Sequence, residues 1–522
     1  MYIITAALIY ANGPVHLGHI KSTYLPADIY TRYLRLKGEE ALYVCATDDH
    51  GTPILLEAEK RGISPKELVR YYHEKDEKEF KALGIEFDIF HWTSSEENKL
   101  TTYEFYEALR PYIYPKKVMQ YYCKELGRFL PDRYIKGKCK YCGAEDQYAD
   151  QCEVCGRTLK PGDLIDPYCT LTKTRPELRE SEHLFFKLSY FAPFLKEYVS
   201  EVAPEELRSY LDKWLEDLQD WDIVRDLEWG IPVPGHPGKV FYVWFDAPIG
   251  YIGSLRALRK HDWEEVWNKS KIYHFIGKDI IYHHYLFWPA MLKGANFNLP
   301  YRIPVRGYLT LEGKKFSKSR GWYLSLEDAL NHLHPDYIRY YLTAITPSGL
   351  TDSDFSLDDL KAKINNELIA NYGNLINRAF KLAQGKELPK LEMNEVEKAL
   401  LEEYKKHMDA TEFKEGLEIA MELVHYYNKL LSDNEPWKKP WEEAKEVVAR
   451  AVYGAALVTA MLYPIIPFTT KKIAEHFKFP LALEYPKEIS LEKPFVPFKK
   501  IEDETDKLKE LLLSRSKGQE SA

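Results

Sequence analysis

The sequence predicts an α/β protein whose split, Rossmann-like parallel-sheet domain carries a zinc-knuckle insertion and is followed by an α-helical bundle. Three observations predict this class. A strand at 2–8, a helix at 16–37 and a strand at 41–46 form a βαβ unit, which requires a parallel pair with a right-handed crossover. The α/β rhythm breaks between about 115 and 220, where paired cysteines and turn residues gather. After about residue 325 the apolar spacing is helical almost throughout.

The elements on either side of the insertion complete the expected sheet. Each expected strand is a short apolar run, and each expected helix shows apolar residues at three- and four-residue spacing. We expect helices at 53–61 and 65–83, strands at 86–91, 240–244 and 272–276, and a helix at 279–292.

The C-terminal third reads as a helical bundle. The ranges 395–406 and 413–431 show the i, i+3, i+4 pattern of amphipathic helices. The uncharged run Ala451–Phe468 is long enough to raise the question of a membrane span, but it contains Gly454, Pro464 and Pro467. We therefore expect a buried bundle helix followed by a turn, and no membrane segment.

Composition places limits on the class of protein. The formal charge of the 522 residues is 72 − 80 = −8, so nucleic-acid binding would need a local basic surface. The first residues lack a basic leader and read as a strand, which favours a cytoplasmic protein. Four of the seven cysteines lie in close pairs, which suggests metal binding in a reducing compartment rather than a disulfide framework.

A pair of histidines opens the first long helix. His16 and His19 follow a strand and the turn 12–14, and their spacing places both imidazoles on one helix face. The free N–H groups at a helix start attract phosphate, and Gly18 leaves room for a flat base to approach the backbone. Taken alone, the pair also fits a metal site or two ordinary surface residues.

A basic loop follows the second half of the sheet. Residues 314–321 read Lys-Lys-Phe-Ser-Lys-Ser-Arg-Gly, with three lysines set among hydroxyl groups. Such a loop can neutralise a pyrophosphate leaving group as negative charge builds on it. The alternative for the isolated segment is a solvated basic turn.

Together the two segments resemble the HIGH and KMSKS signatures of class I aminoacyl-tRNA synthetases, with Leu17 in place of Ile and Phe316 in place of Met. The resemblance implies that His16 and His19 hold the phosphates of ATP, with Mg²⁺ accompanying the nucleotide. It also implies that Lys315 and Lys318 stabilise the transition state of adenylate formation. The implied ATP contacts are Asn12, Gly18, Lys315, Ser317, Lys318 and Ser319.

Four further segments resemble the methionyl branch of that family: 7–13, 47–51, 242–251 and 275–289. The resemblance implies that Asp48 pairs with the substrate ammonium and that an apolar, polarisable wall surrounds a thioether. Two departures, Ile9 and His283, border the implied pocket and leave its shape open. The implied methionine-binding residues are Leu8, Tyr10, Asp48, Trp244, Ala247, Pro248, Tyr251, Ile280, His284 and Trp288.

The insertion carries a double metal knuckle. Cys139 and Cys142 are followed nine residues later by Cys152 and Cys155, and four thiolates at this spacing suit tetrahedral zinc. We expect one structural Zn²⁺, with iron in a rubredoxin-like arrangement as the alternative. Cys169 is left over and resembles the remnant of a second knuckle that some family members carry.

The bundle holds residues that resemble the family's anticodon-reading positions: Asn374, Arg378 and Trp437. An aromatic ring can stack on an unpaired base, while Asn and Arg can read its edge. Without the resemblance, the simpler interpretation is two solvent-facing helix residues and a tryptophan packed between helices.

We therefore expect a methionine-activating enzyme that binds ATP, L-methionine and tRNA(Met), including the initiator, as a monomer or with a separate tRNA-binding chain. The rivals are a class I enzyme for cysteine or for branched aliphatic amino acids, and a catalytically silent tRNA- or metal-binding paralogue. The expected units are the first half of the catalytic domain (1–115), the insertion (116–220), the second half (221–322), a stem-contact linker (323–365), the anticodon-binding bundle (366–495) and a tail helix (496–522).

Overall fold

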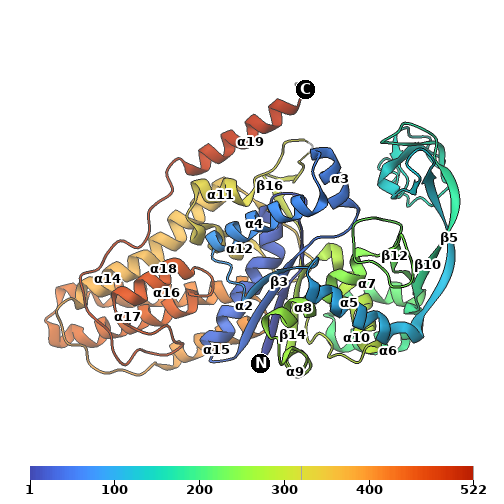
Figure 1. Ribbon diagram of the computed structural model, residues 1–522. Coiled ribbons are helices and arrows are strands. Elements are labelled where there is room, and N and C mark those ends of the chain that lie inside the picture. The colour runs from blue at the N-terminus through green and yellow to red at the C-terminus, as the bar shows by residue number, and fades with distance from the viewer. Residues whose placement is uncertain (319, 521–522) are drawn as a thin grey trace.

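The computed structural model describes residues 1–318 and 320–520 and has three visible parts (Figure 1). A twisted sheet with helices on both faces lies at the centre. The helical bundle packs on one side of this core, and a long pair of strands carries the small cysteine-bearing subdomain out on the other side.

The central sheet is parallel throughout, in the order β15-β14-β1-β3-β2, with β4 paired to β3. Strand β1 joins the two halves of the split domain, because its residue Ile4 lies between Tyr43 on one side and Tyr273 on the other. The predicted parallel sheet is thus confirmed. Its strands are β1 Tyr2–Ala6, β2 Ile9–Tyr10, β3 Ala41–Asp48, β4 Ile89–Trp92, β14 Lys271–Gly277 and β15 Val305–Arg306.

A single helical rod follows the first strands. It consists of α1 Leu17–His19, a π-helical turn Ile20–Tyr24 and α2 Leu25–Leu36, and a left-handed Gly38 ends it. The π turn lies just before Pro26, which has no N–H to donate to the preceding turn. The prediction of one helix across 16–37 is therefore confirmed.

The other helices of the core cover the sheet. In α4, Ser64 and Glu67 form a reciprocal capping box, which explains why the helix begins immediately after Ser64. These helices are α3 Thr52–Arg61, α4 Pro65–Leu83, α5 Glu96–Leu109, α8 Val243–Leu258, α9 Trp263–Lys269 and α10 Trp288–Gly294.

The predicted strand 240–244 is wrong for most of its length. Only Val240–Phe241 (β13) is extended, and it pairs antiparallel with β12, Val224–Arg225, outside the central sheet. The chain then turns into α8, whose first twelve residues are nearly all buried. A helix buried on every side is apolar without periodicity, so the sequence pattern could not distinguish it from a buried strand.

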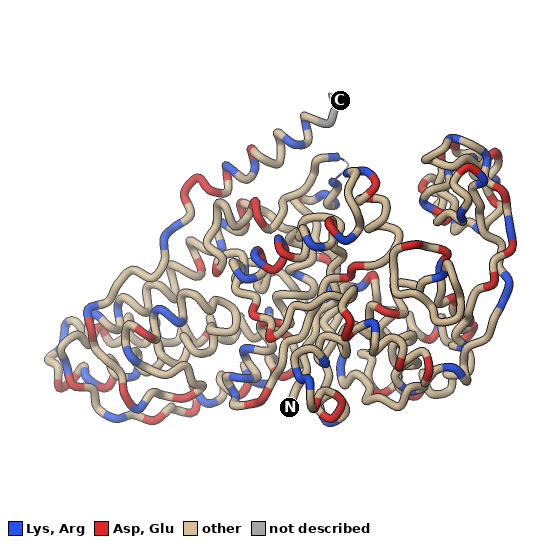
Figure 2. Tube along the Cα trace, in the orientation of Figure 1, with Lys and Arg blue, Asp and Glu red and all other residues tan. Residues whose placement is uncertain are grey.

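The insertion projects from the core on two long antiparallel strands, β5 Ile113–Cys123 and β10 Glu177–Phe186. At their far end lies a three-stranded sheet of β7 Ile135–Cys139, β8 Gln147–Tyr148 and β9 Leu164–Cys169. Both basic and acidic residues lie on these strands in Figure 2, so the arm presents a mixed rather than a basic surface.

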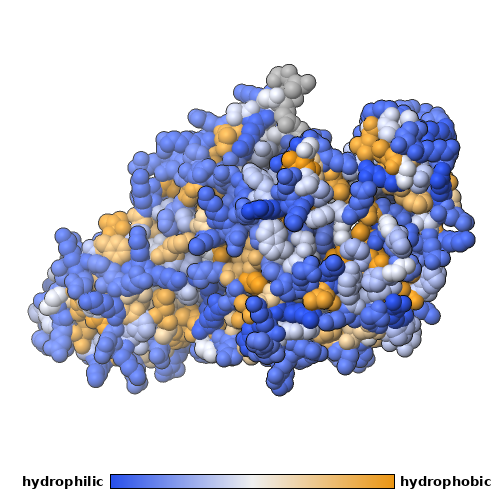
Figure 3. Space-filling model, in the orientation of Figure 1, coloured by the Kyte–Doolittle hydropathy of each residue, from blue (hydrophilic) through white to orange (hydrophobic). Residues whose placement is uncertain are grey.

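The bundle extends from the core through α12 Pro335–Ile345 and α13 Leu357–Ala362. The helices that carry Tyr427 and Gly454 approach each other very closely: a Cβ added at Gly454 would lie only 2.1 Å from the ring of Tyr427. Hydrophilic residues cover most of the face shown in Figure 3, with hydrophobic residues scattered between them. The main bundle helices are α14 Asn374–Ala383, α15 Glu395–Asp409, α16 Phe413–Asn434, α17 Trp441–Leu462 and α18 Pro467–His476.

The run Ala451–Phe468 is a buried helix end followed by a turn, as predicted. Among the helices of residues 1–318 and 320–520, none is long and apolar enough to cross a membrane. The predicted tail helix is α19, Glu504–Glu520, and it lies beside α11, Leu326–His332.

Candidate active site

A cavity of about 410 Å³ opens at the carboxyl ends of β1, β3 and β14, where ligands bind in open parallel sheets. It is built from segments more than 200 residues apart in the sequence. Its lining residues come from the first strand and helix, from the end of β3, from α8, from the end of β14 and from the basic loop. They are Ala7, Leu8, Ile9, Tyr10, Asn12, Gly13, Pro14, His16, His19, Ser22, Thr23, Tyr24, Asp48, Trp244, Gly277, Asp279, Ile280, Phe316, Lys318 and Tyr323.

The two signature histidines cap the helix start with their own side chains. His16 Nδ1 accepts a hydrogen bond from Gly18 N at 3.0 Å, and His19 Nδ1 accepts one from His16 N at 3.3 Å. Their rings stack with centroids 3.6 Å apart. Because each Nδ1 accepts, each neutral ring carries its proton on Nε2 and remains able to donate a hydrogen bond.

Both imidazoles are held neutral. Burial, together with the nearby Lys318 ammonium, lowers the pKa of His16 to about 4. Burial also lowers the pKa of His19, with further contributions from His16 and Lys318. The helix start therefore offers hydrogen-bond donors without a full positive charge, and the charge of this site comes from the lysine.

The basic loop reaches the cavity through Phe316 and Lys318. The Phe316 ring stacks over His16 at 5.1 Å, and a Cβ at Gly13 would lie 2.5 Å from Lys318 Nζ. Gly13 thus leaves the space that the ammonium uses. Lys315 is exposed on the short strand β17, Lys314–Lys315, and lies outside the set of described residues that line the cavity.

Of the two serines in the basic loop, the structure describes only Ser317. Ser317 forms a backbone bridge with Trp322, with N–H···O distances of 2.8 and 2.9 Å. This bridge closes the loop on itself. Ser319, one of the expected ATP contacts, lies outside the described residues.

A carboxylate with one unpartnered oxygen faces the other end of the cavity. Asp48 is the last residue of β3, its side chain is buried, and its Oδ1 has no hydrogen-bond partner. Burial raises the pKa of Asp48, and the neighbouring carboxylates of Asp246 and Asp49 raise it further. Such a group gains stability from an incoming cation, because the cation removes both penalties.

The expected methionine-binding residues fall into two layers. Leu8, Tyr10, Asp48, Trp244 and Ile280 line the cavity. The remaining five lie outside its described lining, and all except Pro248 have exposed fractions between 0 and 3%. They are Ala247, Pro248, Tyr251, His284 and Trp288.

Three residues of the second layer form hydrogen bonds, one within the layer and one to His274. Tyr251 Oη and His284 Nε2 are 2.8 Å apart, and Trp288 Nε1 donates to His274 Nε2 at 3.1 Å. In front of this layer the Trp244 ring stacks on His283 with centroids 3.8 Å apart. His283, one of the two departures from the family pattern, therefore packs directly on a cavity residue.

Sequence reasoning missed several polar groups of the site. Asp279, Ser22 and Thr23 line the cavity, and Asp279 lies two residues beyond Gly277, the last residue of β14. A polar residue at that position of a parallel strand is itself a signal, and it could have identified Asp279. Behind Asp48, His50 Nδ1 and Asp246 Oδ2 form a buried pair at 2.8 Å.

The four predicted cysteines converge at the tip of the insertion. Their sulfur atoms all lie within 4.8 Å of one another, with 3.9 Å between Cys139 and Cys155 and 3.6 Å between Cys142 and Cys152. A tetrahedral ion with metal–sulfur bonds of about 2.3 Å requires sulfur atoms about 3.8 Å apart. These cysteines therefore fit a bound metal ion. Cys169 is buried and lies apart from this cluster.

The expected anticodon residues share one exposed face of the bundle. The Arg378 guanidinium lies 5.6 Å from the ring centroid of Trp437, whose side chain is 50% exposed. Asn374 lies one helical turn before Arg378, and its Nδ2 is 3.5 Å from Asn428 Oδ1. An exposed ring backed by a cation and an amide can receive a stacked base.

The comparison with family models decides the class. Residues 2–380 match the model for tRNA synthetases class I (M). The chain belongs to the methionyl class I tRNA synthetases. This membership agrees with the resemblance of the signature segments and sets aside the cysteinyl and branched-aliphatic rivals.

Methionine–tRNA ligases of other organisms are similar to this chain over nearly its whole length. A methionine–tRNA ligase of Methanocaldococcus jannaschii is 42% identical, over 96% of this chain and 79% of the relative. One of Archaeoglobus fulgidus is 40% identical, over 99% of this chain and 83% of the relative.

Solved structures agree on the fold. A Mycobacterium tuberculosis methionyl-tRNA synthetase in complex with methionyl-adenylate has a TM-score of 0.76 at 25% identity, and the match covers 95% of this chain and 99% of that one. A second structure of that enzyme, bound by methionyl-adenylate, has a TM-score of 0.77 at 24% identity, over 95% of this chain and 100% of that one.

Proposed function

We propose that this chain activates L-methionine with ATP to form methionyl-adenylate and pyrophosphate, and then transfers methionine to the 3′ end of tRNA(Met). One observation carries the proposal: a single cavity holds two imidazole donors and an ammonium at one end and, at the other, a buried carboxylate with one unpartnered oxygen. That arrangement suits a triphosphate at one end and an amino acid at the other. The names of the relatives support the choice of methionine.

At the phosphate end, His16 and His19 donate from Nε2 to phosphate oxygens, and Lys318 neutralises the charge that builds on the pyrophosphate. Catalysis here is positioning and electrostatic stabilisation, without a covalent enzyme intermediate. Asn12 borders the nucleotide from the cavity lining, whereas Gly18, outside the described lining, is assigned on the resemblance alone. Mg²⁺ accompanies ATP as part of the substrate. For Lys315, Ser317 and Ser319 the support is the resemblance to the basic-loop signature alone.

At the amino-acid end, Asp48 pairs with the substrate ammonium, and Trp244, Leu8 and Ile280 contact the side chain. Tyr251 and His284 are bonded to each other behind this wall. Neither lies in the described lining of the cavity, so their contact with the thioether requires the wall to rearrange. Because sulfur is a weak acceptor, most of the selectivity arises from the shape of the wall.

The remaining roles follow the division of the chain. The bundle, 366–495, would read the CAU anticodon with Asn374, Arg378 and Trp437, which gather on its exposed face. The four-cysteine cluster of the insertion, 116–220, would hold one structural Zn²⁺, because four thiolates leave no open coordination position.

ATP–pyrophosphate exchange, measured with each of the twenty amino acids in turn, tests this function. Methionine alone should support exchange. Lys318→Ala should reduce the rate by at least a hundredfold, because it removes the cation that faces the leaving group. The matched control is Lys390→Ala, which removes an exposed lysine of the bundle outside the cavity lining and should leave exchange unchanged. Exchange with another amino acid, or none with methionine, would overturn the proposal.

A further inference from the structure

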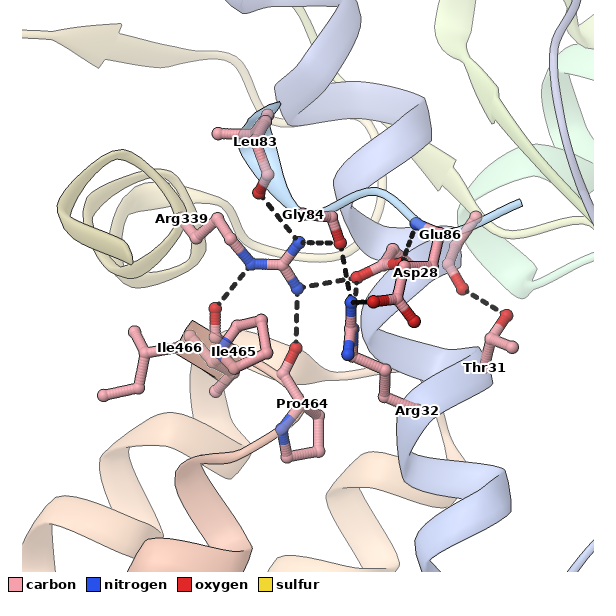
Figure 4. Close-up of polar contacts among 12 residues, drawn as sticks. Asp28, Thr31, Arg32, Leu83, Gly84, Glu86, Arg339, Pro464, Ile465 and Ile466 are labelled. Atoms are coloured by element: carbon pink, nitrogen blue, oxygen red, sulfur yellow. Dashed lines mark hydrogen bonds and ion pairs between the residues drawn. The ribbon is translucent and has the colours of Figure 1, made fainter. Parts of the chain in front are cut away.

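A buried ionic cluster joins the catalytic core to the bundle (Figure 4). It consists of Asp28 and Arg32 on α2 and Arg339 on α12, and we call these three residues the Asp–Arg joint. Their exposed fractions are 1%, 4% and 0%. Charges this deeply buried are costly unless every polar atom has a partner.

Arg339 is completely satisfied. A guanidinium has five N–H donors in a fixed fork, and each of the five meets an acceptor. Nε donates to the carbonyl of the bundle residue Ile465 at 2.8 Å. The other four donors reach Leu83 O at 3.4 Å, Gly84 O at 3.1 Å, Asp28 Oδ2 at 2.7 Å and Pro464 O at 2.8 Å.

Asp28 and Arg32 complete the cluster from the catalytic helix. Arg32 Nε donates to Asp28 Oδ2 at 2.8 Å, and its Nη1 donates to the hydroxyl of Tyr463 at 3.1 Å. The second oxygen of Asp28 accepts from Glu86 N at 2.9 Å. Burial alone would raise the pKa of Asp28, but Arg32, Arg339 and the Glu86 N–H together hold it below its usual value.

The carbonyls of the joint come from two helix ends. Leu83 and Gly84 end α4, and Pro464 and Ile465 follow directly after α17. Helix C-termini carry unpaired carbonyls and the negative end of the dipole, so a buried guanidinium stabilises both ends at once. The joint therefore fixes one helix of the core and one turn of the bundle to the same side chain.

The joint also lies on the rod that carries the signature histidines. The helix runs without a break from Leu17 to Leu36, so Arg32 lies about 20 Å along its axis from His19 at about 1.5 Å per residue. The far end of the rod contacts the bundle again, where Tyr33 Oη donates to Asp409 Oδ1 at 2.8 Å. The rod is therefore attached to the bundle at its far end, away from the signature histidines.

We propose that Asp28, Arg32 and Arg339 are positioning residues, which set the orientation of the bundle relative to the helix that begins at His16. The inference rests on the proposed function, in which one tRNA spans the bundle and the cavity. Amino-acid activation uses the cavity alone, whereas tRNA charging requires the correct span between the two sites. Loosening the joint should therefore impair charging and spare activation.

Arg339→Lys tests the joint, because lysine keeps the charge but has at most three donors and no fork. We expect kcat/KM for tRNA charging to fall at least tenfold, while methionine-dependent exchange stays within twofold of wild type. Tyr463→Phe, which removes only the bond from Arg32 to the bundle, should shift charging in the same direction by two- to threefold. It provides the same test if Arg339→Lys does not fold.

The matched control is Lys37→Met on the same rod. Lys37 also bridges to the bundle, through Asp409 at 2.6 Å, but this ion pair is exposed to solvent. Both activities of this variant should stay within twofold of wild type. Equal losses of exchange and charging in Arg339→Lys would indicate a merely structural role, and unchanged charging would exclude any role. Either result overturns the proposal.

A measurement that needs no activity separates the joint from the proposed function. Spin labels at Tyr71→Cys in α4 and Glu395→Cys in α15 report the distance between core and bundle, and both side chains are exposed. Arg339→Lys should broaden a narrow distance distribution. An unchanged width of the distance distribution would overturn the proposed role of the joint, even if ATP–pyrophosphate exchange confirms the methionine activity. A broadened distribution would support that role, even if methionine supports no exchange.

Discussion

The bundle and the cysteine-bearing insertion are attached to the same core in opposite ways. The bundle is held by the buried Asp–Arg joint, in which each donor of Arg339 has an acceptor. The insertion is held by the β5–β10 pair and by the buried His183 between two aspartates at its base. Farther out, its contacts with the core include exposed ion pairs, such as those of Arg128 with Glu59 and Glu228, both at 3.6 Å. A cavity of about 860 Å³ lies beneath the arm, where the insertion faces α3.

The difference shows that buried charges can fix the orientation of one part on another, whereas exposed charges leave it free to move. Buried, fully satisfied charges impose a defined geometry, because any displacement leaves an ion without a partner in a medium of low dielectric constant. Exposed pairs contribute little and can be replaced by water. The bundle and core should therefore move as one body, whereas the arm can change its angle over the active-site side of the sheet.

The largest effect on the core should come from Asp28→Asn. This change leaves the buried guanidinium of Arg339 without its counter-charge and leaves Arg32 with only the more exposed Glu86, at 3.4 Å. We expect it to lower the free energy of unfolding by about 3–5 kcal/mol. Urea denaturation followed by circular dichroism measures it. A loss below about 1 kcal/mol would mean that the joint resembles a surface pair, and the contrast between the two attachments would fail.

His183, at the base of the arm, should give a smaller and pH-dependent effect. Its ring nitrogens lie 2.6 Å from Asp222 Oδ2 and 2.7 Å from Asp226 Oδ2. Burial alone would lower the pKa of His183, but the hydrogen bonds and charges of the two carboxylates raise it.

A histidine with a raised folded-state pKa binds its proton more tightly in the folded protein. Its contribution is therefore fully present below about pH 6.5, the usual histidine pKa, and is lost as pH rises through the folded value. At about pH 6 we expect His183→Gln to cost about 1–2 kcal/mol, and less at high pH. Unfolding curves at several pH values measure this, and a cost that grows with pH would contradict the assignment.

The exposed pairs of the arm should matter least among the charged contacts. Arg128→Met removes both bridges to the core, and we expect a change below about 1 kcal/mol in the free energy of unfolding. The variant should also free the arm to move, which would appear as a broader distance distribution between labels on the insertion and on the core. A cost as large as that of Asp28→Asn would contradict the comparison.

Removal of the metal should leave the core almost unchanged. Cys142→Ser takes one of four thiolates from the cluster, and we expect the tip of the insertion to lose its metal and its protection from hydrogen exchange. Strands β1 and β14 should keep theirs. Elemental analysis should find one zinc in the wild-type chain, and a parallel loss of protection in the central sheet would show that arm and core are not independent.

Much of this architecture was predictable because its signals are local. The βαβ unit, the helical rod and the bundle helices follow from apolar spacing, and the cysteine cluster follows from ligand spacing. The strand expected at 240–244 failed because a fully buried helix has no periodicity. The Asp–Arg joint left no local signal, since Asp28 and Arg339 are 311 residues apart and each alone resembles a surface residue of a helix.

The site shows the same division. His16, His19 and Lys318 were identified from their motifs, and the structure brings them to one cavity. The separation of the expected methionine-binding residues into a lining layer and a buried layer depends on how α8 packs on the sheet, which no motif encodes. Asp279 was not singled out, although it lies within the matched segment 275–289 and two residues beyond the end of a parallel strand.

The most direct test of the account is a crystal structure of the wild-type chain with a non-hydrolysable methionyl-adenylate analogue. The analogue should lie in the cavity of about 410 Å³, with its phosphate mimic near the Nε2 atoms of His16 and His19 and its ammonium within about 3.5 Å of Asp48, the limit of a hydrogen bond. An analogue bound elsewhere, or bound here with Oδ1 of Asp48 still without a partner, would contradict the central claim.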